Sequence, residues 1–325
     1  MHADGVRALR GSDTDPYRNL AREEALLLAC DRGEAGFPCL YLWQNEHTAV
    51  IGRCQNAWRE CATERMRADG CKLARRTTGG GAVYHDLGNL NFSFIVPRAQ
   101  YDLARQLGVI AGAVRSFGVE CAFSGRNDLL CGGRKFSGNA FRFLKNAALH
   151  HGTLLLRADF ARMARYLQPP QEKLAARGVK SVPARVVNLA EMAPDITVEA
   201  MAEALYGAFC REYGACALEA AEALSLPDYA PLAVRNADWA WNFGAAPAFD
   251  ASFARRFDWG GVELQLRLEE GRVARCDAYT DAMDAELGLR LAQVLEGARF
   301  APDDLAQAAE DVSRDVAAWL AQLKL

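Results

Sequence analysis

The 325-residue sequence predicts an α+β protein: a large domain with a mixed, mostly antiparallel sheet flanked by helices, and a small α+β C-terminal domain. Between residues 39 and 156, apolar runs of strand length come in consecutive groups instead of alternating strictly with helices, which disfavours a doubly wound nucleotide fold. Residues 239–249 mix Trp, Gly, Ala and Pro in the manner of a linker packed on the surface. We therefore place the large domain at residues 1–246 and the small domain at residues 253–325.

In the first half of the large domain, Asp15 and Pro16 predict the start of a helix. Two short apolar runs follow, and we expect them to be adjacent strands. A charged segment then suits one surface helix ending at Gly70, and the next strand leads into a glycine cluster. The helices are expected at residues 17–30 and 58–69, and the strands at residues 39–43, 48–52 and 72–76.

The rest of the chain follows from the same periodicities. The large domain continues with strands at residues 90–96, 128–131, 135–143 and 147–156, helices at 101–117 and 197–213, and short helices at 159–177 that are broken by Pro169 and Pro170. In the small domain we expect a hairpin of residues 262–268 and 273–279, turning at Glu270 and Gly271, and helices at 284–295 and 302–323.

Composition excludes several classes of protein. With 51% hydrophobic and 24% charged residues and a net charge of −3, the chain has no global basic field for nucleic acid or an anionic membrane. No apolar run approaches the roughly 20 residues of a membrane span, and residues 1–11 lack the apolar core of a signal peptide. The ten cysteines are scattered without a C-x-x-C pair. We expect a cytoplasmic protein with reduced thiols, a monomer by default, with neither nucleic acid nor membrane as a partner.

The densest chemical signal is RRTTGGGAVYHD, residues 75–86. Three successive glycines let a ligand approach the backbone closely, and their amides can converge on an anion. The two preceding arginines supply charge suited to phosphate or carboxylate. Neither a G-x-x-x-x-G-K-[ST] loop nor a G-x-G-x-x-G fingerprint occurs, so the stretch predicts an adenylate cradle of another kind. The alternative interpretation is a glycine-rich hairpin turn with a solvated arginine pair.

A second signal is the lysine in GRKFSGN, residues 133–139, which follows GRND at residues 125–128. Only six of the 38 basic residues are lysines, so Lys135 stands where the chain ordinarily writes arginine. A compact ammonium at this position suits a point where a carboxylate and a phosphate meet. The alternative is an ordinary exposed strand lysine.

Histidines give a weaker signal. His150 and His151 are neighbours on a predicted strand and must face opposite ways, so one metal cannot bind both, and no zinc site is expected. We expect one of them to hydrogen-bond in the pocket and the other to be structural. His85 and Asp86 could form an acid/base pair, although a turn made by the aspartate is the simpler interpretation. The absence of a G-x-S-x-G elbow leaves serine-hydrolase chemistry unsupported.

Together these residues resemble the lipoate-protein ligase A family of the biotin/lipoate ligase superfamily. The resemblance rests on the ordered motifs RRTTGGGAVYHDLGNLNFSFI, GRNDLL, RKFSGNA and HHGTLLL. It extends from DPYRNLAREEA near the start to FDWGGVEL at residues 257–264, and so covers nearly the whole chain. One departure is the turn between Asp128 and Lys135, which is shorter than in the family.

The resemblance also implies roles for individual residues. Lys135 would be the catalytic lysine, touching both the acyl carboxylate and the phosphate. Asp128 would lie in the adenylate and magnesium region and is the candidate Mg²⁺ ligand, and residues 178–185 would form a loop covering the adenylate. The remaining residues are implied in ATP binding (Arg76, Gly81, Ala82, Val83, Tyr84), in lining the lipoate pocket (Leu20, Trp43, Arg75, His85) and in support (Gly79, Gly80, Asn127, Ser137, Gly138, His151).

The implied activity has two steps: lipoate reacts with ATP to give lipoyl-AMP and pyrophosphate, and a lysine of an acceptor protein then takes the lipoyl group. The implied acceptors are apo lipoyl domains of 2-oxoacid dehydrogenase E2 subunits and the glycine cleavage H protein, and octanoate is a second implied substrate. ATP and Mg²⁺ are implied, without a tightly bound organic cofactor. In the family's chemistry, amides, Arg76 and Lys135 would stabilise charge developing on the phosphate.

Three alternatives remain. An octanoyltransferase of the same fold would need a cysteine that forms a thioester, and the matching position carries Pro170 instead. A non-catalytic binder of lipoate or adenylates would keep the pocket without needing the intact lysine and glycine cluster. A biotin ligase would need a G-R-G-R-type loop, which this chain lacks.

Overall fold

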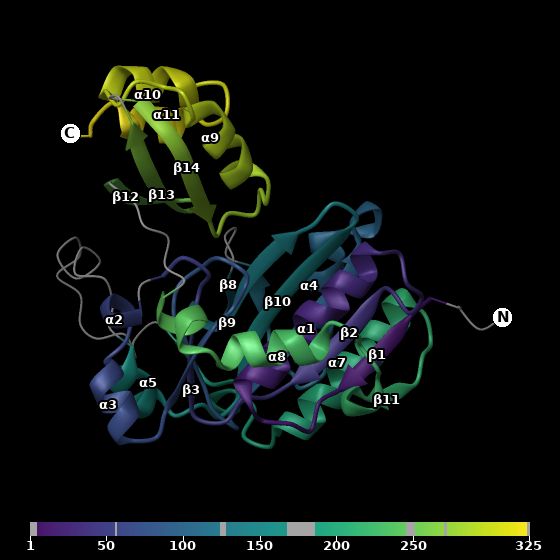
Figure 1. Cartoon of the computed structure of the whole chain (residues 1–325). Coiled ribbons are helices and arrows are strands. Elements are labelled where there is room, and N and C mark those ends of the chain that lie inside the picture. Colours follow the sequence, from purple (N-terminus) through teal and green to yellow (C-terminus); the bar gives the residue numbers. More distant parts are fainter. Residues whose placement is uncertain are drawn as a thin grey trace. The chain divides into compact units, whose positions relative to one another are not determined.

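A computed structural model describes residues 5–55, 57–123, 128–167, 186–244, 251–269 and 272–323 (Figure 1). These residues form two compact units, one ending at residue 244 and the other beginning at residue 251. The predicted boundary between residues 246 and 253 falls largely in the stretch between them, outside the described residues. No helix among the described residues is long and apolar enough to span a membrane.

The large unit is built on an eight-stranded sheet with the order β11-β1-β2-β6-β10-β9-β8-β7. The pairs β11–β1 and β1–β2 are parallel and all others are antiparallel, which confirms the predicted mixed, mostly antiparallel sheet. The strands are β1 (Arg7–Arg10), β2 (Cys39–Trp43), β6 (Asn89–Pro97), β7 (Ala122–Phe123), β8 (Asp128–Cys131), β9 (Arg134–Phe143), β10 (Ala147–Leu155) and β11 (Leu218–Ala220).

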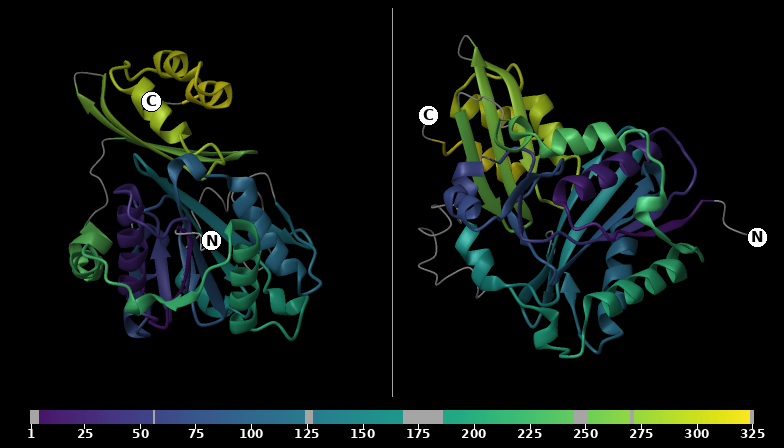
Figure 2. Two further views of the ribbon diagram at one scale, coloured as in Figure 1. Left: turned by 90° about the vertical axis from the view of Figure 1, so that its right-hand side faces the viewer. Right: turned by 60° about the horizontal axis from the view of Figure 1, so that its bottom comes forward.

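Helices cover both faces of this sheet, as predicted (Figure 2, left). Helix α1 (Pro16–Asp31) packs its leucines on one face, and α4 (Leu103–Arg115) and α7 (Val198–Tyr213) pack on the other, against Phe92 and Phe94. The start of α1 is fixed by Asp15, whose Oδ1 accepts hydrogen bonds from two backbone amides of the first turn. Helix α8 (Tyr229–Ala237) packs on α1.

A second, three-stranded sheet holds the glycine cluster. Its central strand β3 (Thr48–Ile51) pairs in parallel with β4 (Lys72–Arg75) and antiparallel with β5 (Val83–His85). The predicted adjacency of the strands at 39–43 and 48–52 is therefore wrong. Both edges of β2 are already paired, with β1 and β6, so the chain leaves the large sheet after Trp43 and begins another one.

The predicted single helix at 58–69 is also wrong. The chain forms two short helices, α2 (Ala57–Glu60) and α3 (Thr63–Ala68), and the buried Cys61 makes an isolated strand-like bridge to Leu167 between them. That bridge uses backbone groups that a continuous helix would have needed internally. Helix α5 (Phe160–Tyr166) follows β10, and residues 168–185 lie outside the described residues.

The small unit confirms the predicted hairpin and the helix expected at 284–295, and it adds one strand. The helical stretch expected at 302–323 is divided into two helices, because the chain turns at residues 310–313. Strand β12 (Ala251–Phe257) pairs with the hairpin of β13 (Gly260–Glu269) and β14 (Arg272–Thr280). Its sequence, ASFARRF, contains neither a continuous apolar run nor a strict alternation, so local pattern did not predict this strand. Helices α9 (Leu287–Leu295), α10 (Pro302–Ala309) and α11 (Arg314–Leu320) pack on this sheet around a core that includes Leu264, Leu291 and Trp319.

Candidate active site

Lys135 reaches the face of the large sheet toward α1 through a bulge in β9. Arg142 of β9 forms an ion pair with Glu24 of α1, so its side chain lies on the face toward α1. Side chains alternate between the two faces along a strand, so Gly138 lies on the same face as Arg142. Strict alternation would place Lys135 on the opposite face. The β8–β9 pairing shifts register next to Phe136, which has no partner in the ladder. A Cβ on Gly138 would lie 2.8 Å from Lys135 Nζ, so the ammonium lies over Gly138. The bulge therefore re-aims Lys135, and the missing side chain at Gly138 leaves room for it.

The Lys135 ammonium has a carboxylate beside it. Asp128 on the neighbouring strand places Oδ1 2.7 Å from Lys135 Nζ, and both side chains remain partly open to solvent. Ser137, between the bulge and Gly138, is fully buried, and its hydroxyl has no partner among the described residues. Asn127 and the predicted covering loop at 178–185 lie outside the described residues.

Arg76 shapes the glycine loop from inside. Its Nη2 donates to the carbonyls of Gly79, at 2.6 Å, and Gly81, at 2.8 Å, and its Nε donates to Thr78 Oγ1 at 3.0 Å. Burial lowers the pKa of Arg76 to about 10, which leaves the guanidinium charged at neutral pH. The family resemblance implies a direct contact of Arg76 with ATP, whereas in this structure Arg76 donates to the carbonyls of its own loop.

This arrangement also orients the amides of the loop. A trans peptide group holds its C=O and N–H antiparallel. Because the carbonyls of Gly79 and Gly81 point at Arg76, the N–H groups of Gly80 and Ala82 point away from it. The loop packs closely on Gly52, where a Cβ would lie 2.4 Å from the Gly80 oxygen. Gly52 thus lets the loop lie against the end of β3.

Arg75 points away from the glycine loop and holds two other segments together. It is 1% exposed, and its Nη1 donates to the carbonyl oxygens of Arg53 (2.9 Å) and Gln55 (2.7 Å). On its other side, Nε and Nη2 donate to the carbonyls of Trp241 and Asn242, in a π-helical turn at Ala240–Gly244. Its donors are thus engaged with backbone, so the structure does not bring Arg75 to the lipoate-pocket position that the resemblance implied.

A buried polar row links α1 to the glycine loop across the sheet. Glu23 Oε1 accepts from His151 Nδ1 at 2.8 Å and from Ser93 Oγ at 2.5 Å, and Trp43 Nε1 donates to the same serine oxygen at 3.0 Å. On the other side of the imidazole, His151 Nε2 bonds to Thr78 Oγ1 at 2.9 Å. His151 and Trp43 are therefore held in place on the face of the sheet that also carries Lys135.

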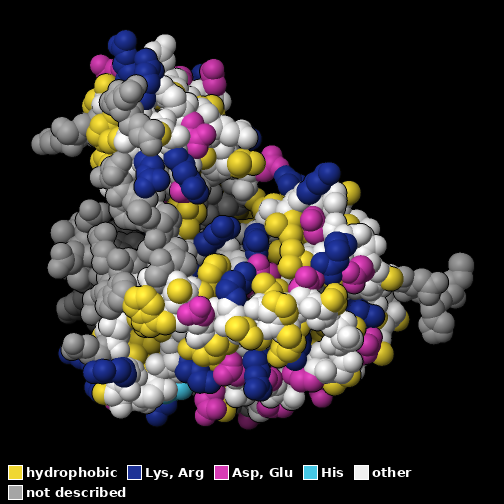
Figure 3. Space-filling model, viewed as in Figure 1, with side chains coloured by type: hydrophobic (Ala, Val, Ile, Leu, Met, Phe, Trp, Pro, Cys, Tyr) yellow, Lys and Arg dark blue, Asp and Glu magenta, His cyan; other side chains and the backbone are white. Residues whose placement is uncertain are grey.

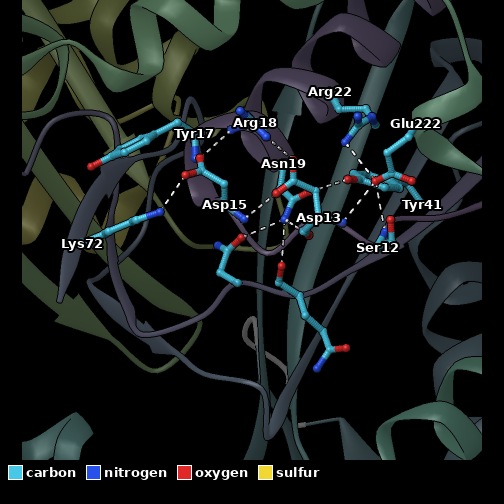
Figure 4. A network of polar contacts seen from close by, with 12 residues as sticks. Ser12, Asp13, Asp15, Tyr17, Arg18, Asn19, Arg22, Tyr41, Lys72 and Glu222 are labelled. Atoms are coloured by element: carbon cyan, nitrogen blue, oxygen red, sulfur yellow. Dashed lines mark hydrogen bonds and ion pairs between the residues drawn. The ribbon is translucent and has the colours of Figure 1, made fainter. Parts of the chain in front are cut away.

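His85 lies beside this row, edge-on to Trp43 at 6.3 Å between ring centroids. Asn45 Nδ2 lies 3.1 Å from His85 Nδ1, and Asn45 Oδ1 accepts from Asn19 Nδ2 at 3.1 Å. Figure 4 shows Asn19 between α1 and the strands, where its Oδ1 accepts from Tyr41. Burial, together with the charges of Arg76 and His151, lowers the pKa of His85 to about 3, so the ring is neutral at pH 7.

The structure shows where His150 and Asp86 lie. His150 is buried on the opposite face from His151 and bonds Gln106 and Asn139 of the core, as strand alternation predicts. Asp86 makes the turn that is its simpler interpretation, because its Oδ1 accepts from the Gly88 amide at 2.8 Å.

The other predicted ligand-binding residues differ in exposure. Gly81 is exposed and Val83 is partly exposed on β5, which is an edge strand among the described residues. Tyr84 is 1% exposed, and its hydroxyl forms a hydrogen bond with His47 Nδ1, so its side chain belongs to the core. Leu20 is buried on α1 within the core near Trp43.

Sequence reasoning missed several residues that build this site. They are Glu23, Asn45, Gly52, Ser93 and Asn91, a buried asparagine on β6 with an unpartnered amide nitrogen among the described residues. Each is an ordinary residue in its local pattern, and its role comes from contacts far away in the chain. The one available signal was the three asparagine or serine residues that interrupt the apolar strand NLNFSFI.

The described residues hold no group of three His, Cys, Asp or Glu side chains arranged for a metal ion. The predicted Mg²⁺ ligand, Asp128, has one oxygen 2.7 Å from a lysine ammonium. A carboxylate paired in this way, and outside any group of three possible ligands in the described part of the chain, does not fit a Mg²⁺ site formed by the protein alone. Basic and acidic side chains are otherwise interspersed on the face shown in Figure 3.

Comparison with known families agrees with this geometry. The lipoyl protein ligase A/B catalytic domain family matches residues 15–210, and the bacterial lipoate protein ligase C-terminus family matches residues 246–321. The first match covers more than half of the chain, which therefore belongs to the lipoyl protein ligase A/B family and is a ligase. The resemblance, the fold class and the enzyme class that the sequence predicted are confirmed.

Particular solved structures are similar to this chain. LipL1 of P. falciparum in complex with lipoate is 27% identical, with a TM-score of 0.79, and the match covers 98% of this chain and 100% of that one. A bipartite lipoate protein ligase of Thermoplasma acidophilum, described with its E2 lipoyl domain, is 26% identical over 77% of this chain and 100% of that one, with a TM-score of 0.65. A lipoate-protein ligase A bound with ATP is 25% identical over 74% and 99%, with a TM-score of 0.62.

Proposed function

We propose that this enzyme activates lipoate with ATP to lipoyl-AMP and transfers the lipoyl group to the ε-amine of a lysine on apo lipoyl domains. A relative in complex with lipoate, a relative bound with ATP and a relative described together with its E2 lipoyl domain support the three reactants. We extend the proposal to the glycine cleavage H protein as a second acceptor and to octanoate as a second acid. We propose further that the enzyme acts in the cytoplasm as a monomer.

In the first step, a lipoate carboxylate oxygen attacks the α-phosphorus of ATP, and pyrophosphate leaves. Negative charge grows on the α-phosphate oxygens, and the Lys135 ammonium would meet it together with the acyl carboxylate. Glycine-loop amides that point away from Arg76 would bind phosphate oxygens, and the edge of β5 at Val83 offers backbone groups to the adenine. We assign Arg76 to shaping this loop and Lys135 to catalysis.

Asp128 enters this step as the resting partner of Lys135. The acid and the phosphate would take its place at the ammonium, so that Lys135 exchanges one anionic partner for another without being left unpaired. ATP is expected to arrive with Mg²⁺, but Asp128 does not fit an isolated Mg²⁺ site, and we derive no step through the ion.

In the second step, the acceptor lysine attacks the acyl carbon of lipoyl-AMP, and AMP leaves. The attacking amine must be neutral, and a free lysine has a pKa of about 10.4. Water would hydrolyse the mixed anhydride between the steps, so the adenylate needs a cover. We keep residues 178–185, which lie outside the described residues, as the proposed covering loop.

One observation carries the proposal: the Lys135 ammonium lies over Gly138 on the face of the sheet whose buried row leads to the glycine loop. The test combines the purified protein with ATP, Mg²⁺, lipoate and an apo lipoyl domain. We expect acceptor modification and AMP release, and loss of both with Lys135→Ala. The cysteine-dependent transferase would instead modify the acceptor from octanoyl carrier protein without ATP, and that result would refute the proposal.

A further inference from the structure

A hydrogen-bond donor at His85 is held in a fixed position beside Trp43 and has no partner among the described residues. The amide nitrogen of Asn19 is identified by its bonds to the carbonyls of Asp13 and Gln44, at 2.8 and 2.7 Å, because carbonyls only accept. It also faces Asn45 Oδ1, which turns the Asn45 NH₂ toward His85 Nδ1. His85 Nδ1 must therefore accept, and the ring proton sits on Nε2.

This Nε2–H group is buried and lacks a partner among the described residues. Leaving such a donor unsatisfied costs about 1–3 kcal/mol, so it points to a ligand atom that carries a lone pair. A second buried amide lies close by. Asn91 stands opposite Trp43 in the sheet, and its Nδ2 has no partner within the described structure, while its Oδ1 accepts from Asn89. Both groups flank the Trp43 indole.

These two donors lie at the far end of the site from Lys135. Trp43, Asn91 and Thr153 are successive register partners across β2, β6 and β10, and Gly138 N donates to Thr153 Oγ1 from β9. Neighbouring strands are about 4.8 Å apart, so Trp43 lies roughly 14 Å from Gly138, over which the ammonium is held. An extended eight-carbon acid with a hydrogen bond at each end spans a gap of this order.

We infer that His85, positioned by Asn45, and Asn91 donate hydrogen bonds to the sulfur atoms of the dithiolane ring and thereby select lipoate over straight-chain octanoate. This inference rests on the proposed function, which places the carboxylate at Lys135. The only lone-pair atoms of lipoate distant from its carboxylate are the two sulfurs. Octanoate ends in a methyl group and would leave both donors unsatisfied. A site built around such donors rejects the analogue that lacks the acceptor.

The first test compares kcat/KM for lipoate and octanoate in the ATP-dependent reaction of the full chain. We expect His85→Phe to lower the lipoate-to-octanoate ratio about tenfold, and Asn45→Leu to lower it less, because a freed ring keeps some of its Nε2–H form. His150→Gln is the matched control, since it also alters a buried histidine but on the opposite face of the sheet. It should affect both acids equally. An unchanged ratio in His85→Phe would overturn the inference even if the ligase activity is present.

The second test reads the histidine directly. With ¹⁵N-labelled histidine, the protein should show a neutral His85 protonated at Nε2, assigned by its absence in His85→Phe. Lipoate should shift this N–H resonance and octanoate should not. If neither acid is activated with ATP but lipoate shifts the resonance, the proposed function fails and the recognition site stands. If lipoate binds without shifting it, or if the proton is found on Nδ1, the inference fails alone.

Discussion

Replacing Gly138 with alanine tests whether the placement of Lys135 matters separately from the stability of the fold. The added Cβ would lie 2.8 Å from Lys135 Nζ and 2.9 Å from its Cε, whereas ordinary contact begins near 3.4 Å. The ammonium must therefore move by at least 3.4 − 2.8 = 0.6 Å. A displacement of about 1 Å at a reacting group can cost roughly 100-fold in rate, so we expect the adenylation rate to fall about 10- to 100-fold.

The assay is ATP-dependent pyrophosphate release with lipoate, measured beside thermal unfolding. Only the end of a flexible side chain must yield, so Tm should change by no more than about 2 °C, in the range of a surface substitution. Gly108→Ala is the matched control, because its Cβ meets no atom within 4 Å on helix α4, and it should leave the rate unchanged. A Gly138→Ala enzyme with the wild-type rate would refute the positioning of Lys135 by this glycine. A large fall in Tm would refute the separation of function from stability.

Three further predictions follow from the buried groups. Arg75→Lys keeps the positive charge, but a lysine cannot donate to the carbonyls on both sides of the arginine. We expect the free energy of unfolding to fall by about 3 kcal/mol and Tm by roughly 10 °C. A Tm within about 2 °C of wild type would contradict this expectation. Gly52→Ala drives a Cβ to 2.4 Å from the Gly80 oxygen and should raise the KM for ATP about tenfold or more with lipoate binding retained, as nucleotide and lipoate titrations would measure. Burial lowers the pKa values of His85 and His150 to about 3, so the unfolded chain binds more protons than the folded one below about pH 6.5. Urea unfolding should then show the free energy of unfolding falling by about 1 kcal/mol per pH unit for each histidine as the pH is lowered from about 6.5 to 5. A flat profile would exclude neutral buried rings.

Local patterns in the sequence predicted most elements of the fold, because strands and helices here follow their hydrophobic periods. The errors arose where long-range pairing decides. Strands 39–43 and 48–52 look like neighbours from their spacing, yet β2 is paired on both sides by strands from elsewhere in the chain. The break at Cys61 depends on a bridge to Leu167, more than a hundred residues away, which no local signal announces.

The same limit applies to the site. Residue type and spacing singled out Lys135 and the glycine cluster, but the face on which the lysine lies depends on a bulge at Phe136 that alternation alone would reverse. From the sequence, the adjacent Arg75 and Arg76 were expected to bind one anion together. In a strand, however, neighbours diverge, and which carbonyls converge on each guanidinium is a property of the assembled fold.

The burial of Arg75 and Arg76 limits which groups of the site can bind an anion. Arg75 and Arg76 are buried, and the hydrogen bonds of both go to protein oxygens, so neither is placed to hold a phosphate tightly. Among the residues of the site that the structure describes, an anion could meet the Lys135 ammonium, which is paired with Asp128, and the amides of the glycine loop, which carry no net charge. Backbone amides and an ammonium that exchanges partners hold a resting anion only weakly, but they are already oriented toward it. Such a site therefore stabilises charge that develops in the transition state more than charge that the bound substrate already carries. In the proposed reaction, this weak hold on a bound anion would favour release of pyrophosphate after the first step and of AMP after the second, which an arginine-lined pocket would retard.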